Sequence, residues 1–268
     1  MVGRYCSHCG EKRLTPKDYS LSHLAEETLG VFTHVDSKFL RTLKALLTKP
    51  GELSRAYFQG GRSRYTKPLT LFVIINVVFF VVQPHTGLWH QKYATYMRDR
   101  HYAAAVDAQV ASSKEPVQRY AARFDANLQN QKKSLLIFSV PLLALAMSLL
   151  FIGTRRSYVE HLVFSVQVYA FDLLCLLTFA LLVVAPLKMV ARTAGSGGAR
   201  LRSVLDGELA IAVASILWLT IYMYNGLRRA YDASRVRAGL GAFALALTVM
   251  YLTGIYYRML FWATFWTT

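Results

Sequence analysis

Charged residues are scarce in this sequence, and acidic ones are scarcer still. Only 17% of the 268 residues are charged, with 15 Asp and Glu against 31 Lys and Arg. A soluble domain carries about 25% charged residues. Hydrophobic residues make up 54% of the chain, and they stand in long blocks. This balance excludes an ordinary soluble domain and predicts an all-α integral membrane protein.

Cysteine is also rare, with Cys6, Cys9 and Cys175 as its three copies. A small, odd number in a chain of this length excludes a disulfide-stapled secreted fold. Cys175 lies inside a hydrophobic block and is expected to be a small core residue. The first 68 residues are polar and lack a secretory signal, so we expect an internal span to direct membrane insertion.

The sequence lacks the motifs of the common enzyme classes. It contains no GxSxG elbow, no P-loop, no HExxH and no GxGxxG that follows a strand, so we expect no enzymatic activity. The formal charge of +16 would also fit nucleic-acid binding, but the apolar blocks favour a membrane protein with basic cytosolic loops. Membrane lipids, and not nucleic acid, are therefore the expected partners.

Five hydrophobic segments are candidates for transmembrane helices, which need about 20 apolar residues each. They cover residues 69–82, 135–152, 162–187, 209–224 and 240–266. The first has only 14 residues, so it crosses the bilayer if the flanks between 66 and 89 contribute and is re-entrant otherwise. The predicted architecture is about five transmembrane helices in a domain over residues 69–268.

Small residues mark one face of the fifth segment. Ala238, Ala242 and Ala246 repeat at four-residue spacing, which lets helices approach closely in a membrane. Packing within the chain fits this pattern, and so does an interface between copies in a homo-oligomer.

The distribution of Lys and Arg predicts the orientation. Twelve of the 31 stand before residue 69, so the N-terminus is expected in the cytosol and the C-terminus outside. Residues 85–133 then form a long charged connection on the outer side. Apolar residues recur there at helical spacing, which predicts a helical extracytoplasmic loop that Pro116 divides in two.

Residues 1–19 carry a cysteine knuckle that is expected to face the cytosol. Cys6 and Cys9 are separated by two residues and followed by a glycine, and two thiolates in such a turn supply half of a tetrahedral zinc site. A knuckle without metal is the alternative, and zinc is the one cofactor that the sequence suggests. Candidates for the missing ligands are the same cysteines of a second copy, or His8, His23 and His34.

Residues 20–68 are predicted to form basic amphipathic helices beside the membrane. Between residues 20 and 48, apolar residues recur at three- and four-residue spacing with Lys and Arg between them, which is typical of a helix on the lipid headgroup layer. Pro50-Gly51 ends this helix, and a shorter helix is expected at 52–59. Basic residues then gather before the first span, where they either anchor the topology or bind lipid phosphate or another anion. These residues are Arg55, Arg62, Arg64 and Lys67.

This N-terminal stretch resembles a bacterial family of inner-membrane proteins of uncharacterised function. The resemblance rests on CxxCGEK and on HVDSKFLRTLKALLTKPGELSRAYFQGGRSRYTKP, with its H-x-D, T-L-x-x-L-L, P-G, G-x-R-x-x-Y and P elements, and covers about residues 5–82. It implies a location in the bacterial inner membrane, with several spans and a cytosolic N-terminus. It implies no activity.

A polar stripe enters the third hydrophobic segment. Asp172 is the residue of most interest there, because a carboxylate at mid-bilayer costs about 2.5–3.5 kcal/mol. On a helix, His161, Ser165 and Asp172 share one face, with Glu160 at its mouth. Two interpretations stay open: a proton path or cation site, or a structural carboxylate that is neutral or paired with another span. The polar residues considered as partners are Asn76, Tyr222, Asn225, Tyr251 and Arg258.

Two classes of function remain. The polar stripe favours an oligomeric channel or transporter with an intramembrane acidic site, and this is the first interpretation. The N-terminal segment favours a membrane scaffold or regulatory protein that recruits a cytosolic protein partner or senses anionic lipid. The sequence identifies neither a transported solute nor a partner.

Overall fold

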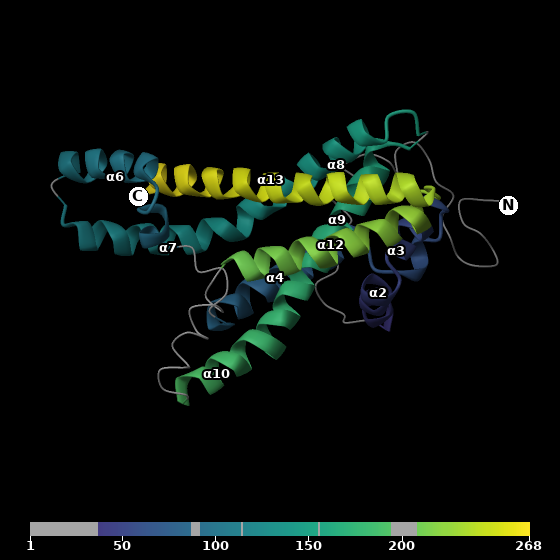
Figure 1. The fold of residues 1–268 in the computed structure, drawn as a ribbon, viewed down its shortest axis with the longest axis horizontal. Helices are drawn as coiled ribbons and strands as arrows, with labels where there is room; N and C mark the ends of the chain where they lie inside the picture. Colours follow the sequence, from purple (N-terminus) through teal and green to yellow (C-terminus); the bar gives the residue numbers. More distant parts are fainter. Residues whose placement is uncertain (1–36, 87–91, 114, 155, 194–207) are drawn as a thin grey trace.

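The structure is a computed structural model that describes residues 37–86, 92–113, 115–154, 156–193 and 208–268 (Figure 1). Every regular element within these ranges is a helix, which confirms the predicted all-α class.

The N-terminal segment contributes α2 (Ser37–Thr48), α3 (Glu52–Phe58) and a short 3-10 turn, η2 (Arg62–Arg64). A second turn, η3 (Leu136–Phe138), joins α7 to α8, and a π-helical turn, η4 (Ala180–Val184), joins α9 to α10. The remaining helices are α4 (Pro68–Thr86), α5 (Tyr93–Tyr96), α6 (Arg100–Ser113), α7 (Val117–Leu135), α8 (Ser139–Leu150), α9 (Tyr158–Phe179), α10 (Ala185–Thr193), α12 (Glu208–Ala230) and α13 (Arg235–Thr267).

Three stretches of helix are long and apolar enough to cross a membrane: Pro68–His85, Tyr158–Val190 and Arg235–Thr267. A fourth is added if Val117–Lys132 and Leu136–Leu150, which meet at 41°, form one broken span. These helices support a membrane protein. The prediction of five spans is not confirmed. α12, which covers the predicted fourth segment, is not among these stretches, and α8, in the predicted second segment, is long enough only together with α7.

The helix that contains the first hydrophobic segment extends beyond the predicted residues 69–82 at both ends. α4 has 19 residues and reaches about 28 Å at 1.5 Å per residue, close to the thickness of the bilayer core. Pro68 is the first residue of the helix. A backbone N–H at this position would have no partner within the helix, so proline costs no hydrogen bond there. The flanks therefore contribute, and α4 needs no re-entrant path to cross.

The long helices run between two ends of the molecule (Figure 1). At one end, here called the α3 end, the short turns from α8 to α9 and from α12 to α13 gather beside α2 and α3. At the other, the α6 end, α6 and α7 lie beside the last turns of α13, and the rings of Tyr102 and Phe261 lie 4.2 Å apart. The region 85–133 was expected to be a helical loop divided at Pro116, and α6 and α7 do lie on either side of that proline. Its location outside the membrane stays a prediction.

α12 and α13 pack along each other, and small residues bring them together. Ala238 and Ala242 are fully buried, and Ala246 is 3% exposed. At Gly241, a Cβ would lie 3.2 Å from Leu227 of α12. The small-residue face of α13 thus serves packing within the chain, and an interface between copies stays a prediction.

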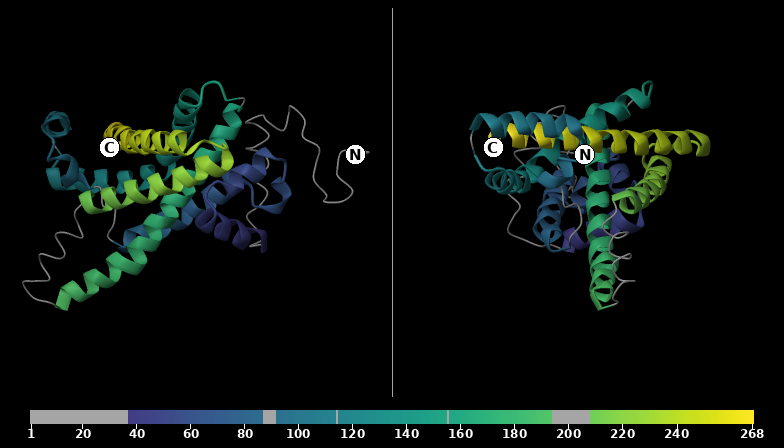
Figure 2. Two further views of the ribbon diagram at one scale, coloured as in Figure 1. Left: turned by 45° about the vertical axis from the view of Figure 1, so that its right-hand side comes forward. Right: turned by 60° about the vertical axis from the view of Figure 1, so that its left-hand side comes forward.

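α9 continues through η4 into α10 and leaves the bundle. α10 extends away from the other helices in every view (Figure 1 and Figure 2), and Leu182 and Met189 are 72% and 73% exposed. The π-helical turn precedes Pro186, whose ring and missing N–H disturb the α-helical hydrogen bonds of the preceding turn. This exposed apolar stretch is suited to lipid contact.

Candidate functional site

The N-terminal helices are held on the α3 end by a tight turn. α2 ends at Thr48, and Gly51 takes a φ of 79°, a left-handed conformation that glycine adopts without strain. The turn redirects the chain so that α3 packs across both α9 and α12. The short helix expected at 52–59 therefore forms as Glu52–Phe58 and is packed against the long helices.

Two glycines let this turn touch α12 backbone to backbone. A Cβ on Gly51 would lie 2.6 Å from the carbonyl oxygen of Gly226, and a Cβ on Gly226 would lie 2.9 Å from the ring of Phe164. Both distances are shorter than van der Waals contact. A larger residue at either position would push the N-terminal segment or α12 out of place.

Hydrogen bonds tie the same segment to α9 and α12. Ser54 Oγ donates to Gln167 Oε1 over 2.7 Å, and both residues are buried, with exposures of 0% and 2%. Arg229 Nη1 donates to the backbone oxygen of Pro50 over 3.1 Å. A buried pair of this kind is costly to break from one side, because the remaining polar group loses its partner away from water.

Arg156, in the turn between α8 and α9, joins three parts of the α3 end. Its Nη1 pairs with Glu160 Oε1 at 3.0 Å, and Nη2 donates to the backbone oxygen of Ala230 over 3.5 Å. The guanidinium also lies 4.6 Å from the centre of the Phe58 ring, a cation–π contact with α3. Ser157 and Glu160 close a capping box that fixes the start of α9 beside it.

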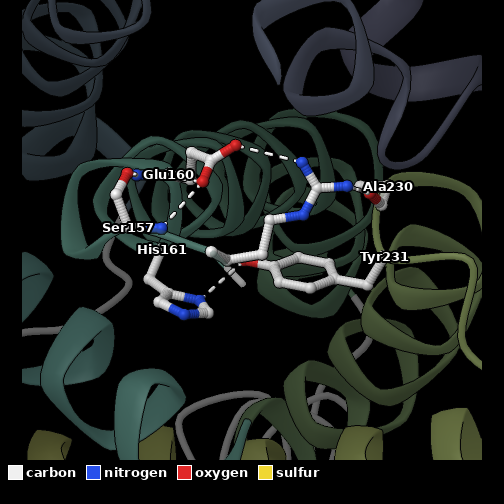
Figure 3. Close-up of polar contacts among 6 residues, drawn as sticks. Ser157, Glu160, His161, Ala230 and Tyr231 are labelled. Atoms are coloured by element: carbon white, nitrogen blue, oxygen red, sulfur yellow. Dashed lines mark hydrogen bonds and ion pairs between the residues drawn. The ribbon is translucent and has the colours of Figure 1, made fainter. Parts of the chain in front are cut away.

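Tyr231 and His161 form the second polar contact of this cluster (Figure 3). Tyr231 Oη lies 2.9 Å from His161 Nδ1, and the two rings stack with centroids 5.6 Å apart. The rings of Phe58 and Tyr231 also meet edge to face, with centroids 5.7 Å apart. Burial raises the pKa of Tyr231, Glu160 adds to this rise and Arg156 opposes it, so the phenol keeps its proton.

We call this cluster the docking junction: Phe58 of α3, Arg156, Glu160 and His161 at the start of α9, and Tyr231 after α12. Its contacts link α3 to the ends of α9 and α12 through both charge and ring packing. Glu160 and His161 were predicted from the sequence as the mouth of a polar stripe. Here Glu160 pairs with Arg156 and His161 contacts Tyr231, and these two partners touch Phe58 of α3.

α2 has one buried face and one exposed face. Thr42, Ala45 and Leu46 are buried, and α2 packs on α3 and α9. Leu40 and Leu47, by contrast, are 62% and 44% exposed. The exposed cations of the helix lie beside them: Lys38, Arg41 and Lys44.

The four basic residues singled out before the first span differ in their surroundings. Arg55 and Arg64 are exposed, and Lys67 is half-buried. Arg64 lies 5.8 Å from the ring centre of the adjacent Tyr65. Arg62 is described only in its backbone, as the first residue of η2. An anion held by these residues stays a prediction.

The polar stripe of α9 does not form one continuous surface. His161 turns to Tyr231, and the fully buried Ser165 points its Oγ at Met147 Sδ of α8, 3.6 Å away. Asn76 of α4 is half-buried, and its Nδ2 has no hydrogen-bond partner among the described residues. The structure thus brings together Glu160 and His161 but gives Ser165 and Asn76 separate environments.

Asp172 has a partner that the sequence did not suggest. Its Oδ1 accepts a hydrogen bond from Trp218 Nε1 of α12 at 3.0 Å. Of the partners considered, Tyr222 stacks on Phe171 at 3.8 Å, and Asn225 donates to its own helix at Ile221. Tyr251 and Arg258 are exposed on α13. The spacing of apolar residues does not reveal which residue of α12 faces Asp172, because this depends on how α12 is rotated about its own axis.

The proposed zinc ligands lie outside the described residues. Cys6, Cys9, His8, His23 and His34 all precede residue 37. Within the part of the chain that the structure describes, no group of three or more His, Cys, Asp or Glu is placed to hold a metal ion.

A family described as proteins of unknown function, DUF3667, matches residues 36–80. No curated protein and no solved structure matches the chain. The matched residues comprise α2, α3, η2 and most of α4, and they include Phe58 of the docking junction. It falls inside the stretch of residues 5–82 that carries the resemblance to a bacterial inner-membrane family, whose motif pattern stays a prediction.

Proposed function

We propose that this chain is a regulatory or scaffold protein of the bacterial inner membrane. In this proposal, its basic N-terminal segment binds anionic lipid on the cytosolic face. Binding changes the position of the segment and thereby the contacts that it makes with the long helices. The observation that carries the proposal is the seat of α3 across α9 and α12, with its backbone contact at Gly51 and its buried Ser54–Gln167 bond. A segment that served only as a topology anchor would need no such fitted seat.

The exposed face of α2 has the chemistry of a headgroup contact. Leu40 and Leu47 offer apolar side chains, and Arg41 and Lys44 offer cations beside them. Such a surface gains from burying leucine side chains at the acyl boundary and from pairing cations with anionic phosphates. Each cation near an anionic membrane surface contributes about 1 kcal/mol. The segment is therefore expected to distinguish anionic from zwitterionic membranes.

The docking junction provides the route from this surface to the long helices. α2 packs on α3, and α3 contacts the start of α9 and the end of α12 through Phe58, Arg156 and Tyr231. A change in how deeply α2 lies in the headgroup layer would thus strain the contacts that α3 makes with the start of α9 and the end of α12. A cytosolic protein partner that binds the segment would act through the same route.

The test uses the full chain reconstituted in vesicles of zwitterionic lipid, with or without anionic phospholipid. Leu47→Cys, in a chain whose native cysteines are replaced by serine, carries an environment-sensitive dye. We expect the dye to report a less polar setting when anionic lipid is present. Arg41→Gln with Lys44→Gln should remove this difference, whereas Arg235→Gln with Arg237→Gln, which removes two exposed cations of α13 at the same end, should keep it. An equal dye signal in both lipids would overturn the proposal.

A second candidate function is an oligomeric channel or transporter, favoured by one observation. Asp172 lies within the apolar span Tyr158–Val190 and meets Trp218 at the contact of α9 with α12. Intramembrane carboxylates are rare and often mark ion pathways. Proteoliposomes with the wild-type chain should then show ion flux that Asp172→Asn lacks, and equal flux in both would exclude this function.

A further inference from the structure

Asp172 lies deep within a spanning helix. In the span Tyr158–Val190, it is 12 residues from Glu160 and 16 from Lys188, about 18 Å and 24 Å along the helix axis. The bilayer core is about 30 Å thick, so neither end of the span brings this carboxyl group to the headgroup layer. Its charge must be neutralised or satisfied locally.

The local hydrogen bonding satisfies only part of an ionised carboxylate. Trp218 Nε1–H, which can only donate, points at Oδ1 from 3.0 Å. In the described residues, Oδ2 has neither a hydrogen bond nor an ion pair. One indole donor thus faces a group that accepts about four hydrogen bonds when it is ionised.

The surrounding titratable groups bring no positive charge. Tyr169 and Cys175 of α9 lie close enough to interact electrostatically with Asp172, and Tyr222 of α12 lies close to Cys175. These phenols and this thiol are neutral in the physiological range. Among the described residues, no Lys, Arg or His forms an ion pair with Asp172, and Trp218 is the side chain that is hydrogen-bonded to it.

We propose that Asp172 is a reversible proton-binding site in the membrane interior, at the contact of α9 with α12. Binding forms one O–H bond at Oδ2 with a proton from water and removes the negative charge, while Trp218 still donates to Oδ1. Release of the proton restores the carboxylate, whose only described donor is then Trp218. The two states differ by one full charge at a helix contact.

This site does not depend on the lipid-reading function proposed above. The channel or transporter function would use it if the carried ion is a proton, but proton binding itself requires no transport. Flux that is unchanged by Asp172→Asn would therefore exclude the transport function and leave the proton site standing.

Infrared difference spectroscopy on the reconstituted full chain tests the proposal. We expect a carboxylic acid C=O band that disappears as the pH rises and that is absent from Asp172→Asn at every pH. Trp218→Phe removes the donor to the ionised form, so its band should persist to higher pH, by about one unit or more for a bond to a charged group. Trp262→Phe, at the α6 end, should leave the band unchanged.

Two results would overturn the proposal. One is a chain in which no pH-dependent acid band is lost in Asp172→Asn, although the variant unfolds at the wild-type temperature. The other is a band that responds equally to Trp218→Phe and Trp262→Phe, which would place the titrating group away from the contact between α9 and α12.

Discussion

The carbonyl oxygen of Gly226 lies so close to Gly51 that any side chain at position 51 would clash with it. A Cβ at position 51 would be 2.6 Å from this oxygen, so the turn before α3 and the last part of α12 meet without side chains between them. The two glycines are 175 positions apart along the chain.

Gly51→Ala should dislodge the N-terminal segment, and Gly60→Ala provides a matched control. Both glycines have positive φ, 79° and 85°, so alanine at either position destabilises the fold by about 1–2 kcal/mol, the cost of a left-handed backbone conformation for a residue with a Cβ. Only position 51 adds a backbone clash, because nothing lies within 4 Å of a Cβ at Gly60. We expect a clearly larger loss of thermal stability in detergent for Gly51→Ala. Equal losses would show that the contact with Gly226 contributes nothing.

Ser54→Ala should leave the buried amide of Gln167 without its partner. The expected loss of stability is about 1–3 kcal/mol, the usual cost of an unsatisfied buried polar group. Ser148→Ala is the matched control, because Ser148 Oγ donates only to Ala144 of its own helix, at 2.9 Å. Thermal unfolding compares the two.

A double variant sharpens this test. Ser54→Ala combined with Gln167→Leu removes both polar groups and should recover much of the stability that Ser54→Ala loses. If the double variant is no more stable than Ser54→Ala alone, the buried hydrogen bond is not the source of the loss.

Arg156→Lys should loosen α3 although it keeps the charge. Lysine retains an attraction to Glu160, but it lacks the planar group that lies over Phe58 and the second donor that reaches Ala230. We expect amide hydrogen exchange across Glu52–Phe58 to accelerate by about tenfold, which corresponds to local opening that costs less free energy. Arg228→Lys, at an exposed position near the end of α12, should not change this exchange. Faster exchange in both variants would point to a general loss of stability.

Most of the helices could be predicted from the sequence, because the spacing of apolar residues and the residues that end helices act over a few neighbouring positions. Pro50-Gly51 ends α2, and Pro116 separates α6 from α7, as expected from the conformational limits of proline and glycine. α4 exceeds its apolar run because helix formation does not stop at the first polar side chain. The limit of local reasoning appears in α12, which continues six residues past the predicted end at 224.

The contacts of the docking junction could not be predicted in the same way. Phe58, Arg156 and Tyr231 come from three distant parts of the chain, and each alone has the pattern of an ordinary loop or helix-end residue. The pairing of Asp172 with Trp218 depends on how α9 and α12 are rotated about their axes. The sequence marks Glu160, His161 and Asp172 as polar residues at or within an apolar run, but it does not identify their partners. Gln167 stands in the same run, and nothing in the sequence identifies Ser54 as its partner.

At the α6 end, Gln131→Ala should weaken the attachment of α7 to α13. Gln131 Nε2 donates to Thr267 Oγ1 over 2.6 Å, and its Oε1 accepts from Thr264 Oγ1 at 3.3 Å. Thr264 keeps a second bond, to the backbone oxygen of Leu260, so the expected cost is moderate, about 1 kcal/mol. Gln118→Ala, at an exposed position of the same helix, is the control. Limited proteolysis should cut the Gln131→Ala chain faster within α7 and leave the control at the wild-type rate. Identical rates in the two variants would mean that ring contacts such as that of Phe124 with Phe261, whose centroids lie 5.8 Å apart, hold α7 on α13 without help from these polar contacts.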